Sequence, residues 1–139
     1  MMILINETQT REFASSIAKT LKVGDIILLS GDLGSGKTFI AREIIQNLAK
    51  TAIKVTSPTF NILQTYETAS FIVYHYDLYR LKFSHELHEL GIEEALNGSH
   101  ICIIEWPEIL LPLLPKPYIQ IHLEVIGTTR KCTKMIFSS

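Results

Sequence analysis

The segment Gly31-Asp32-Leu33-Gly34-Ser35-Gly36-Lys37-Thr38 fits the pattern G-x-x-x-x-G-K-[ST] completely. Its glycines allow the backbone to curl so that successive N–H groups point at phosphate oxygens. In such a loop the lysine reaches the β- and γ-phosphates, and the threonine hydroxyl ligates Mg²⁺. The alternative is an ordinary glycine-rich turn between a strand and a helix, which the complete motif and its context disfavour. The segment therefore predicts a site for a nucleoside triphosphate with Mg²⁺.

Two acidic residues that follow apolar segments are candidates for a second contact with the metal. Glu105 follows Ile101 to Ile104, and Asp77 follows Phe71 to Tyr76. A parallel strand would deliver such a carboxylate beside the phosphate loop. We favour Glu105 for the metal, because its continuously apolar segment is expected to be central in the sheet. Asp77 would then orient the attacking water or sense the γ-phosphate. The alternative for either acid is a strand-end cap or a salt bridge.

The elements on both sides of the loop are those that would position it. Ile26 to Leu29 is an apolar run without alternation, which predicts a strand covered on both faces, as in parallel α/β sheets. A helix is expected to begin near Lys37, and its amino end adds partial positive charge at the phosphates. Apolar residues at i, i+4 spacing form the expected buried stripe of this helix: Ile40, Ala41, Ile44, Ile45 and Leu48.

The remaining segments complete the prediction of the fold. A first helix is indicated by Phe13, Ala14, Ile17, Ala18 and Leu21, and a mixed helical region by Leu81 to Asn97, interrupted by Gly91. The expected strands are Ile3 to Ile5, one ending at Val55, the antiparallel neighbours Asn61 to Tyr66 and Phe71 to Tyr76, Ile101 to Ile104, and a hairpin of Tyr118 to Val125 and Arg130 to Phe137 around Gly127. Together they predict one domain over residues 1–139: a three-layer α/β P-loop NTPase fold, with a mixed sheet of parallel centre and antiparallel additions.

The composition excludes several classes of protein. A length of 139 residues suits one domain, and 47% hydrophobic with 19% charged residues exclude wholesale disorder. The net charge of -1 leaves no strongly basic surface for nucleic acid, although a local patch is compatible with it. The start has no signal-peptide pattern, and the apolar runs are far too short to span a membrane. The two cysteines, Cys102 and Cys132, lie in apolar segments and indicate buried thiols, so we expect a soluble cytoplasmic protein.

Missing motifs narrow the class of phosphate-loop protein. The chain has neither the N-K-x-D segment of guanine-specific GTPases nor the L-S-G-G-Q segment of transporter ATPases. Small-molecule kinases usually clamp the transferred phosphate with several arginines on a lid, and this chain has only Arg11, Arg42, Arg80 and Arg130. These exclusions favour a minimal ATPase. A small-molecule kinase and a nucleotide-dependent binding module remain as alternatives.

Further motifs, in order along nearly the whole chain, resemble those of one family. They are Ser57-Pro58-Thr59-Phe60, His75-Tyr76-Asp77-Leu78-Tyr79-Arg80-Leu81, Glu86-Leu87 with Leu90-Gly91, and Glu105-Trp106-Pro107-Glu108. With the phosphate loop they resemble the bacterial tRNA threonylcarbamoyladenosine biosynthesis ATPases TsaE, also called YjeE. The resemblance implies an ATPase that works with TsaD and TsaB to make threonylcarbamoyladenosine (t6A) beside the anticodon of tRNA. One departure is Glu43, where many relatives have glycine; we expect it to face solvent and leave nucleotide binding unaffected.

The resemblance also implies roles for particular residues. The Mg²⁺ ligands fall on Thr38 and Glu105, the essential aspartate on Asp77, the functional tryptophan on Trp106, and an adenine-side contact near Glu7. The nucleotide-binding loop falls on Asp32, Leu33, Gly34, Ser35, Gly36, Lys37 and Thr38.

Several other residues have both a functional and a structural interpretation. Thr59, in the implied first switch Ser57 to Phe60, would sense the γ-phosphate or merely belong to a turn. Trp106 would stack on a partner or sense the nucleotide, or close the core rim. Arg80 and Arg130 would contact phosphate or a partner, or form structural salt bridges. His75 would position Asp77 or fill the strand end, whereas His85 and His88 lack a third ligand and suit a polar helix surface better than a zinc site.

Overall fold

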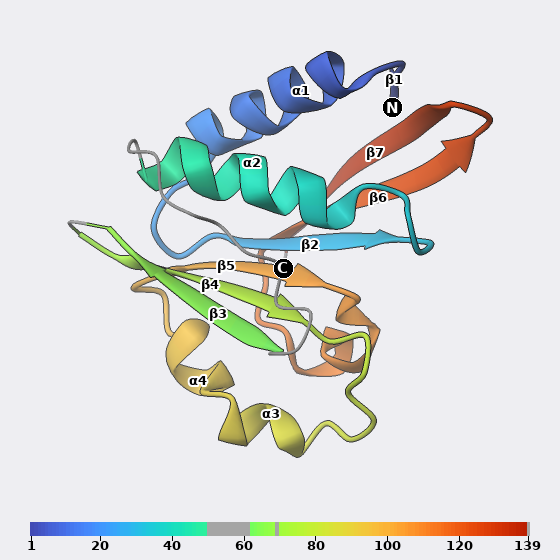
Figure 1. Ribbon diagram of the computed structural model, residues 1–139. Coiled ribbons are helices and arrows are strands. Elements are labelled where there is room, and N and C mark those ends of the chain that lie inside the picture. Colours follow the sequence, from blue (N-terminus) through green and yellow to red (C-terminus); the bar gives the residue numbers. More distant parts are fainter. Residues whose placement is uncertain (50–61, 69, 139) are drawn as a thin grey trace.

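The centre of the protein is a mixed β-sheet. The computed structural model describes residues 1–49, 62–68 and 70–138, and within these ranges seven strands form one sheet in the order β1-β7-β6-β2-β5-β4-β3 (Figure 1). The strands are β1 (Met2–Leu4), β2 (Ile26–Gly31), β3 (Leu63–Glu67), β4 (Ile72–Asp77), β5 (Ile101–Glu105), β6 (Tyr118–Ile126) and β7 (Thr129–Phe137).

The central strands are parallel and the outer pairs are antiparallel. β2 lies between β5 and β6 and is parallel to both, and β4 is parallel to β5. The pairs β1–β7, β6–β7 and β3–β4 are antiparallel. The predicted mixed sheet with a parallel centre and antiparallel additions is therefore confirmed. β2 and β5 are central because their apolar side chains are buried on both faces of the sheet.

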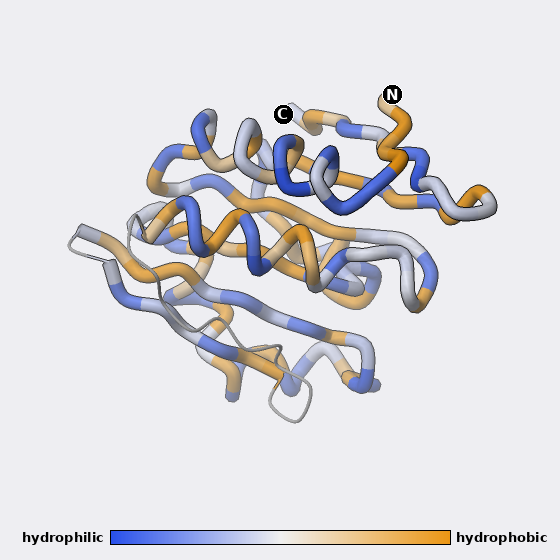
Figure 2. The backbone as a smooth tube through the Cα atoms, turned by 45° about the horizontal axis from the view of Figure 1, so that its top comes forward, coloured by the Kyte–Doolittle hydropathy of each residue, from blue (hydrophilic) through white to orange (hydrophobic). Residues whose placement is uncertain are grey.

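Helices cover both faces of the sheet (Figure 1). α1 (Glu7–Thr20) and α2 (Lys37–Ala49) pack on one face; Asn6 caps α1 by accepting a hydrogen bond from the Gln9 N–H at 2.9 Å. The opposite face carries the short helices α3 (Glu86–Glu89) and α4 (Ile92–Ala95), and two 3₁₀ turns, Pro107–Ile109 and Leu111–Leu113, follow β5. In Figure 2 hydrophobic and hydrophilic residues alternate along the helices, as expected when one side of each helix is buried.

A hydrophobic cluster fills the space on each side of the sheet, which gives the three predicted layers. Between the sheet and the long helices lie the predicted stripes, including Phe13, Ile17, Ile40 and Ile44, all buried. The second cluster lies between the sheet and the short helices, and Tyr76 is fully buried in it, with its hydroxyl donating to the Leu90 carbonyl at 2.8 Å. Both cysteines are buried and unpaired with each other.

Some expected elements differ from the structure. The helical region at 81–97 is interrupted at Gly91 as predicted, where the backbone is left-handed (φ 68°), but the helices on either side, α3 and α4, are shorter than expected. The strand expected to end at Val55 lies outside the described residues. Among the described residues, no helix combines the length and apolar character needed to cross a membrane.

Candidate functional site

The phosphate-loop segment connects the carboxyl end of β2 to the start of α2. Gly31 has φ 138°, and a Cβ atom there would lie 2.4 Å from the Leu123 carbonyl oxygen of β6, so the close approach of the two strands requires glycine. The Ser35 N–H donates to the Asp32 carbonyl at 3.1 Å, which tightens the loop. α2 begins at Lys37, so its unpaired amino-terminal N–H groups lie at the end of this loop. The curl and the helix start together form an anion-binding arrangement.

Lys37 is a buried cation held at the loop. Its side chain is only 5% exposed, and Nζ donates to the carbonyls of Gly31 at 2.6 Å and Asp32 at 2.8 Å. Nζ also lies 4.1 Å from the centre of the Trp106 ring. Burial lowers the pKa of Lys37, and the nearby carboxylates of Glu105, Asp77 and Asp32 oppose this shift. Among the described residues Lys37 forms no direct ion pair, so its charge is available to an anion bound at the loop.

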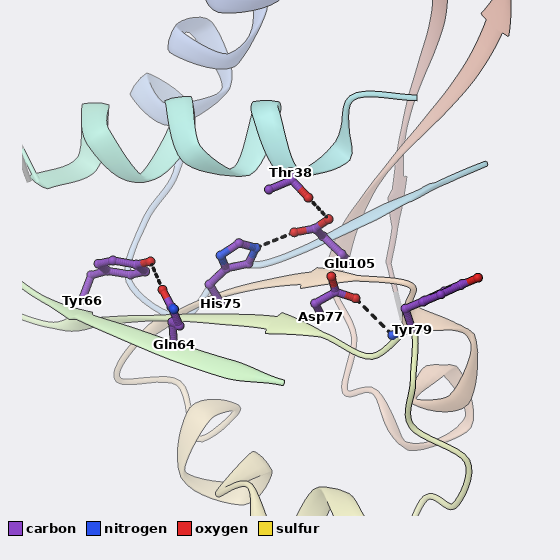
Figure 3. A network of polar contacts seen from close by, with 7 residues as sticks. All are labelled: Thr38, Gln64, Tyr66, His75, Asp77, Tyr79 and Glu105. Carbon is purple, nitrogen blue, oxygen red and sulfur yellow. Dashed lines mark hydrogen bonds and ion pairs between the residues drawn. The ribbon is translucent and has the colours of Figure 1, made fainter. Parts of the chain in front are cut away.

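Thr38, Glu105 and His75 form a continuous hydrogen-bonded row (Figure 3). Thr38 Oγ1 donates to Glu105 Oε1 at 2.7 Å, and His75 Nε2 contacts Glu105 Oε2 at 2.6 Å. Glu105 is 1% exposed and His75 is fully buried. β5 delivers Glu105 to this position because it lies beside β2, with Glu105 in register with Leu29 at the end of that strand. His75 contacts Glu105, and no hydrogen bond joins it to Asp77, the partner that one of its two interpretations named.

The oxygens of Thr38 and Glu105 suit magnesium. A hydroxyl and a carboxylate are hard donors of the kind that Mg²⁺ prefers, and the ion usually keeps several waters and shares phosphate oxygens. In the part of the chain that the structure describes, no three His, Cys, Asp or Glu side chains gather as a metal site. Thr38 and Glu105 would supply only part of the coordination of such an ion.

Asp77 ends β4 on the same edge of the sheet, in register with Glu105. Its Oδ1 accepts a hydrogen bond from the Tyr79 N–H at 3.1 Å (Figure 3). Burial raises the pKa of Asp77, partly opposed by that hydrogen bond. The second carboxylate oxygen has no hydrogen bond among the described residues, so it can accept one from a water molecule.

Trp106 has the backbone strain that often accompanies a functional position. Its φ of 56° is the only positive value among the described residues other than glycine. The Trp106 N–H donates to the Leu29 carbonyl at 3.2 Å, which fixes it against β2. Its ring covers Lys37 and lies 4.8 Å from the ring of Tyr79, which is 52% exposed. Trp106 therefore contacts both the buried lysine and a surface aromatic residue.

A pocket of about 300 Å³ adjoins the phosphate loop. It lies between the start of α1, the start of α2 and the β6–β7 hairpin. Its walls include Glu7, where an adenine-side contact was expected, together with Asn6, Phe39 and Arg130. Ser35 and Gly36 of the loop also line it, so the pocket is continuous with the phosphate-binding segment.

Arg130 is the residue of the site that sequence reasoning placed least well. No salt bridge involves Arg130 among the described residues; its Nε donates to the Ser35 carbonyl at 3.1 Å and Nη2 to the Gly34 carbonyl at 3.4 Å. The Ser35 C=O and the Gly36 N–H belong to the same trans peptide, so they point in opposite directions. Because Arg130 binds the carbonyl, the Gly36 N–H points away from Arg130. No local pattern marks this contact, since it joins positions 95 residues apart.

Other predicted residues lie away from this arrangement or outside the described ranges. Thr59 and the implied switch Ser57–Phe60 fall outside the described residues. Arg80 is exposed, and its side chain has no polar contact within the described ranges. His85 and His88 are exposed; His85 stacks on Phe83 and His88 contacts Glu93.

Arg11 and Glu43 lie on the neighbouring helices α1 and α2. Glu43 is partly buried, with Arg11 Nε at 3.6 Å from its carboxylate, so it does not face solvent freely as expected.

The chain is similar to several known proteins over most of its length. The profile of the family described as "Threonylcarbamoyl adenosine biosynthesis protein TsaE" matches residues 4–132. A "tRNA threonylcarbamoyladenosine biosynthesis protein TsaE" from Rickettsia felis is 51% identical over all 139 residues of this chain and 81% of its own length. The protein of the same name from Bacillus subtilis is 35% identical over 88% of this chain and 76% of its own. The crystal structure of Bacillus subtilis YdiB superimposes with a TM-score of 0.78 at 27% identity, covering 99% of this chain and 84% of that one.

Proposed function

Because this chain belongs to the TsaE family of threonylcarbamoyl adenosine biosynthesis proteins, we propose that it binds and hydrolyses ATP during t6A synthesis in tRNA. The observation that carries the proposal is the convergence of three groups at one edge of the sheet. The Lys37 ammonium, the Thr38–Glu105 pair and the Asp77 carboxylate lie around one phosphate-binding loop. A cation, an oxygen pair for metal and a free carboxylate are what phosphoryl transfer to water requires.

The loop would bind the triphosphate through backbone N–H groups and the start of α2, and Lys37 would neutralise charge on the β- and γ-phosphates. Thr38 and Glu105 would hold Mg²⁺, which supplies further neutralisation of the phosphate charge when bound. Asp77 would orient the attacking water through its free oxygen, and Thr59 would sense the γ-phosphate. The pocket beside the loop supports placing the nucleoside there, with Glu7 and Phe39 as its neighbours.

We propose TsaD and TsaB as the partners, with tRNA reached only through that complex. Two exposed apolar side chains support a docking surface at the edge of the site, Leu33 at 66% and Tyr79 at 52% exposed. Trp106 lies directly under Tyr79 and over Lys37, so a partner bound here would meet the nucleotide site. Arg80 is exposed beside Tyr79 and would contact such a partner. Since the described arginines offer no finger aimed at the loop interior, we expect the isolated chain to hydrolyse ATP slowly.

The cellular role is tested by replacing the cell's own copy with Lys37→Ala and measuring t6A in total tRNA by nucleoside analysis. We expect t6A to fall to the level of a strain without the gene, because the triphosphate is no longer bound. An unchanged t6A level would refute the proposed role. The alternative activity, a small-molecule kinase, predicts instead that the wild-type chain alone phosphorylates a nucleoside or sugar rapidly.

Arg130 gives a prediction about the loop itself. Arg130→Gln should weaken ATP and ADP binding about tenfold, because hydrogen bonds from a charged donor contribute about 1.5–3 kcal/mol and here act indirectly through the loop. Isothermal titration calorimetry measures the effect. Arg42→Gln, an exposed arginine of α2, is the matched control and should bind like the wild type. Equal affinities for all three proteins would show that Arg130 does not shape the loop.

A further inference from the structure

His75 is a buried polar side chain that has no role in the proposed hydrolysis. It lies on β4 in register with Ile103, two residues before Glu105 of the neighbouring strand, so both side chains project from the same face of the sheet. That face packs against α2 and is otherwise lined by aliphatic residues such as Val73, Ile101 and Ile103. A histidine at this position needs an explanation, because burying a polar ring costs free energy unless its nitrogens are hydrogen-bonded.

Among the residues that the structure describes, only one of the two His75 nitrogens has a partner. Nε2 lies 2.6 Å from Glu105 Oε2, and Nδ1 has no hydrogen-bond partner within the described part of the chain. Since a carboxylate oxygen accepts, Nε2 carries the hydrogen of this bond. Within residues 1–49, 62–68 and 70–138, the bond to Glu105 is therefore the one hydrogen bond that holds this buried ring.

That bond restrains the carboxylate from the side opposite the loop. Thr38 holds Oε1 and His75 holds Oε2, so both oxygens of Glu105 are fixed and rotation about the last side-chain bond is blocked (Figure 3). The Thr38 hydroxyl would offer a lone pair to a metal ion, and the bond from His75 would hold Oε2 of Glu105 while it did so. Partners of this kind hold metal-binding carboxylates in place in other proteins.

We propose that His75 is a positioning residue, which fixes the rotamer of Glu105 through Nε2 and so sets the affinity for the divalent ion that accompanies the nucleotide. The inference rests on the proposed function, since it takes Glu105 as a metal ligand. It assigns His75 no contact with the nucleotide and no transfer of a proton.

Three variants separate positioning from a general structural role. His75→Leu fills the space without a donor, and His75→Asn keeps polarity but its shorter amide does not reach Oε2. His75→Gln places an amide N–H near the position of Nε2 and should restore the bond. The matched control is Tyr76→Phe, which removes a buried hydrogen bond from the same strand on its opposite face.

The measurement is Mn²⁺ binding followed by electron paramagnetic resonance, with a non-hydrolysable ATP analogue at saturation. A second titration measures analogue affinity in EDTA. We expect His75→Leu and His75→Asn to bind Mn²⁺ about 10–100-fold more weakly, with unchanged affinity in EDTA. We expect His75→Gln to recover most of the loss and Tyr76→Phe to match the wild type.

Results that contradict the role of His75 differ from results that contradict the proposed function. Wild-type Mn²⁺ affinity in both His75→Leu and His75→Asn would overturn the inference, and so would an equal loss in Tyr76→Phe or a parallel loss of affinity in EDTA. If His75→Leu does not fold, His75→Asn and His75→Gln still give opposite expectations. A wild-type chain that binds no nucleotide at all would instead refute the proposed function.

Discussion

Lys37→Ala should lose about 30-fold or more in affinity for ATP. The ammonium is the only described cation at the loop that is buried, and a hydrogen-bonded charge pair of this kind typically costs about 2–5 kcal/mol when one partner is removed. The variant also leaves the carbonyls of Gly31 and Asp32 without their donor, so the loop loses the group that draws its two ends together. Affinity for adenosine, which carries no phosphate, should change little.

Calorimetric titration with ATP, ADP and adenosine measures this difference. Lys19→Ala removes an exposed lysine at the far end of α1 and should leave all three affinities unchanged. Lys37→Met keeps the apolar stem beside Trp106 and should lose affinity as fully as alanine. If Lys37→Met binds ATP normally, the charge of Lys37 is not what holds the phosphates.

Asp77→Asn should lose about 10²–10⁴-fold in the rate of ATP hydrolysis while keeping most of its affinity for ATP. A group that orients or deprotonates the attacking water contributes about this factor. Asparagine retains the oxygen that accepts from the Tyr79 N–H, so the turn after β4 is preserved. Single-turnover hydrolysis and equilibrium binding, measured on the same preparation and with the partners added, give the two quantities.

The control for Asp77 is Asp25→Asn. Asp25 precedes β2 at the other end of the sheet and also accepts a backbone hydrogen bond, from the Lys22 N–H at 2.8 Å. The Asp25→Asn variant should hydrolyse ATP at the rate of the wild type. Equal losses of rate and affinity in Asp77→Asn would contradict the role assigned to Asp77. If this variant no longer hydrolyses ATP but cellular t6A is intact, the alternative function, a nucleotide-dependent binding module, would be favoured.

Asp77→Asn should also make the nucleotide-free protein more stable near neutral pH. Burial raises the pKa of Asp77, so the folded state binds its proton more tightly than the unfolded state does. The stabilising contribution of this group is complete below its unfolded pKa and is lost as the pH rises through the folded value. At neutral pH the ionised carboxylate therefore destabilises the fold, and Asp77→Asn should raise the melting temperature. A lower melting temperature would show that the charge is stabilised by a partner.

The elements of the fold that can be predicted from the sequence are those with one strong local pattern, such as an apolar run or a glycine motif. The apolar runs at Ile26–Leu29 and Ile101–Ile104 predict central strands, because a strand buried on both faces has few alternatives. The glycine pattern fixes the loop between strand and helix. The region around Gly91 was less predictable, because a helix of four residues depends on its packing rather than on its own periodicity.

The contacts that complete the site could not be predicted because they are set by strand order. Arg130 reaches the loop only because the carboxyl-terminal hairpin pairs with β2 through β6. His75 meets Glu105 only because β4 lies beside β5, and 30 residues separate the two positions. Sequence spacing indicates which residues share a strand face, whereas the choice of neighbouring strand depends on the whole topology.

The position of Trp106 has a practical consequence. The chain contains a single tryptophan, and its indole ring lies 4.1 Å from the Lys37 ammonium. All tryptophan fluorescence of the protein therefore comes from one ring at the phosphate loop, and a nearby positive charge affects the emission of an indole. The unlabelled protein thus carries an optical probe of its own lysine, which can follow loop rearrangements in real time without an added dye.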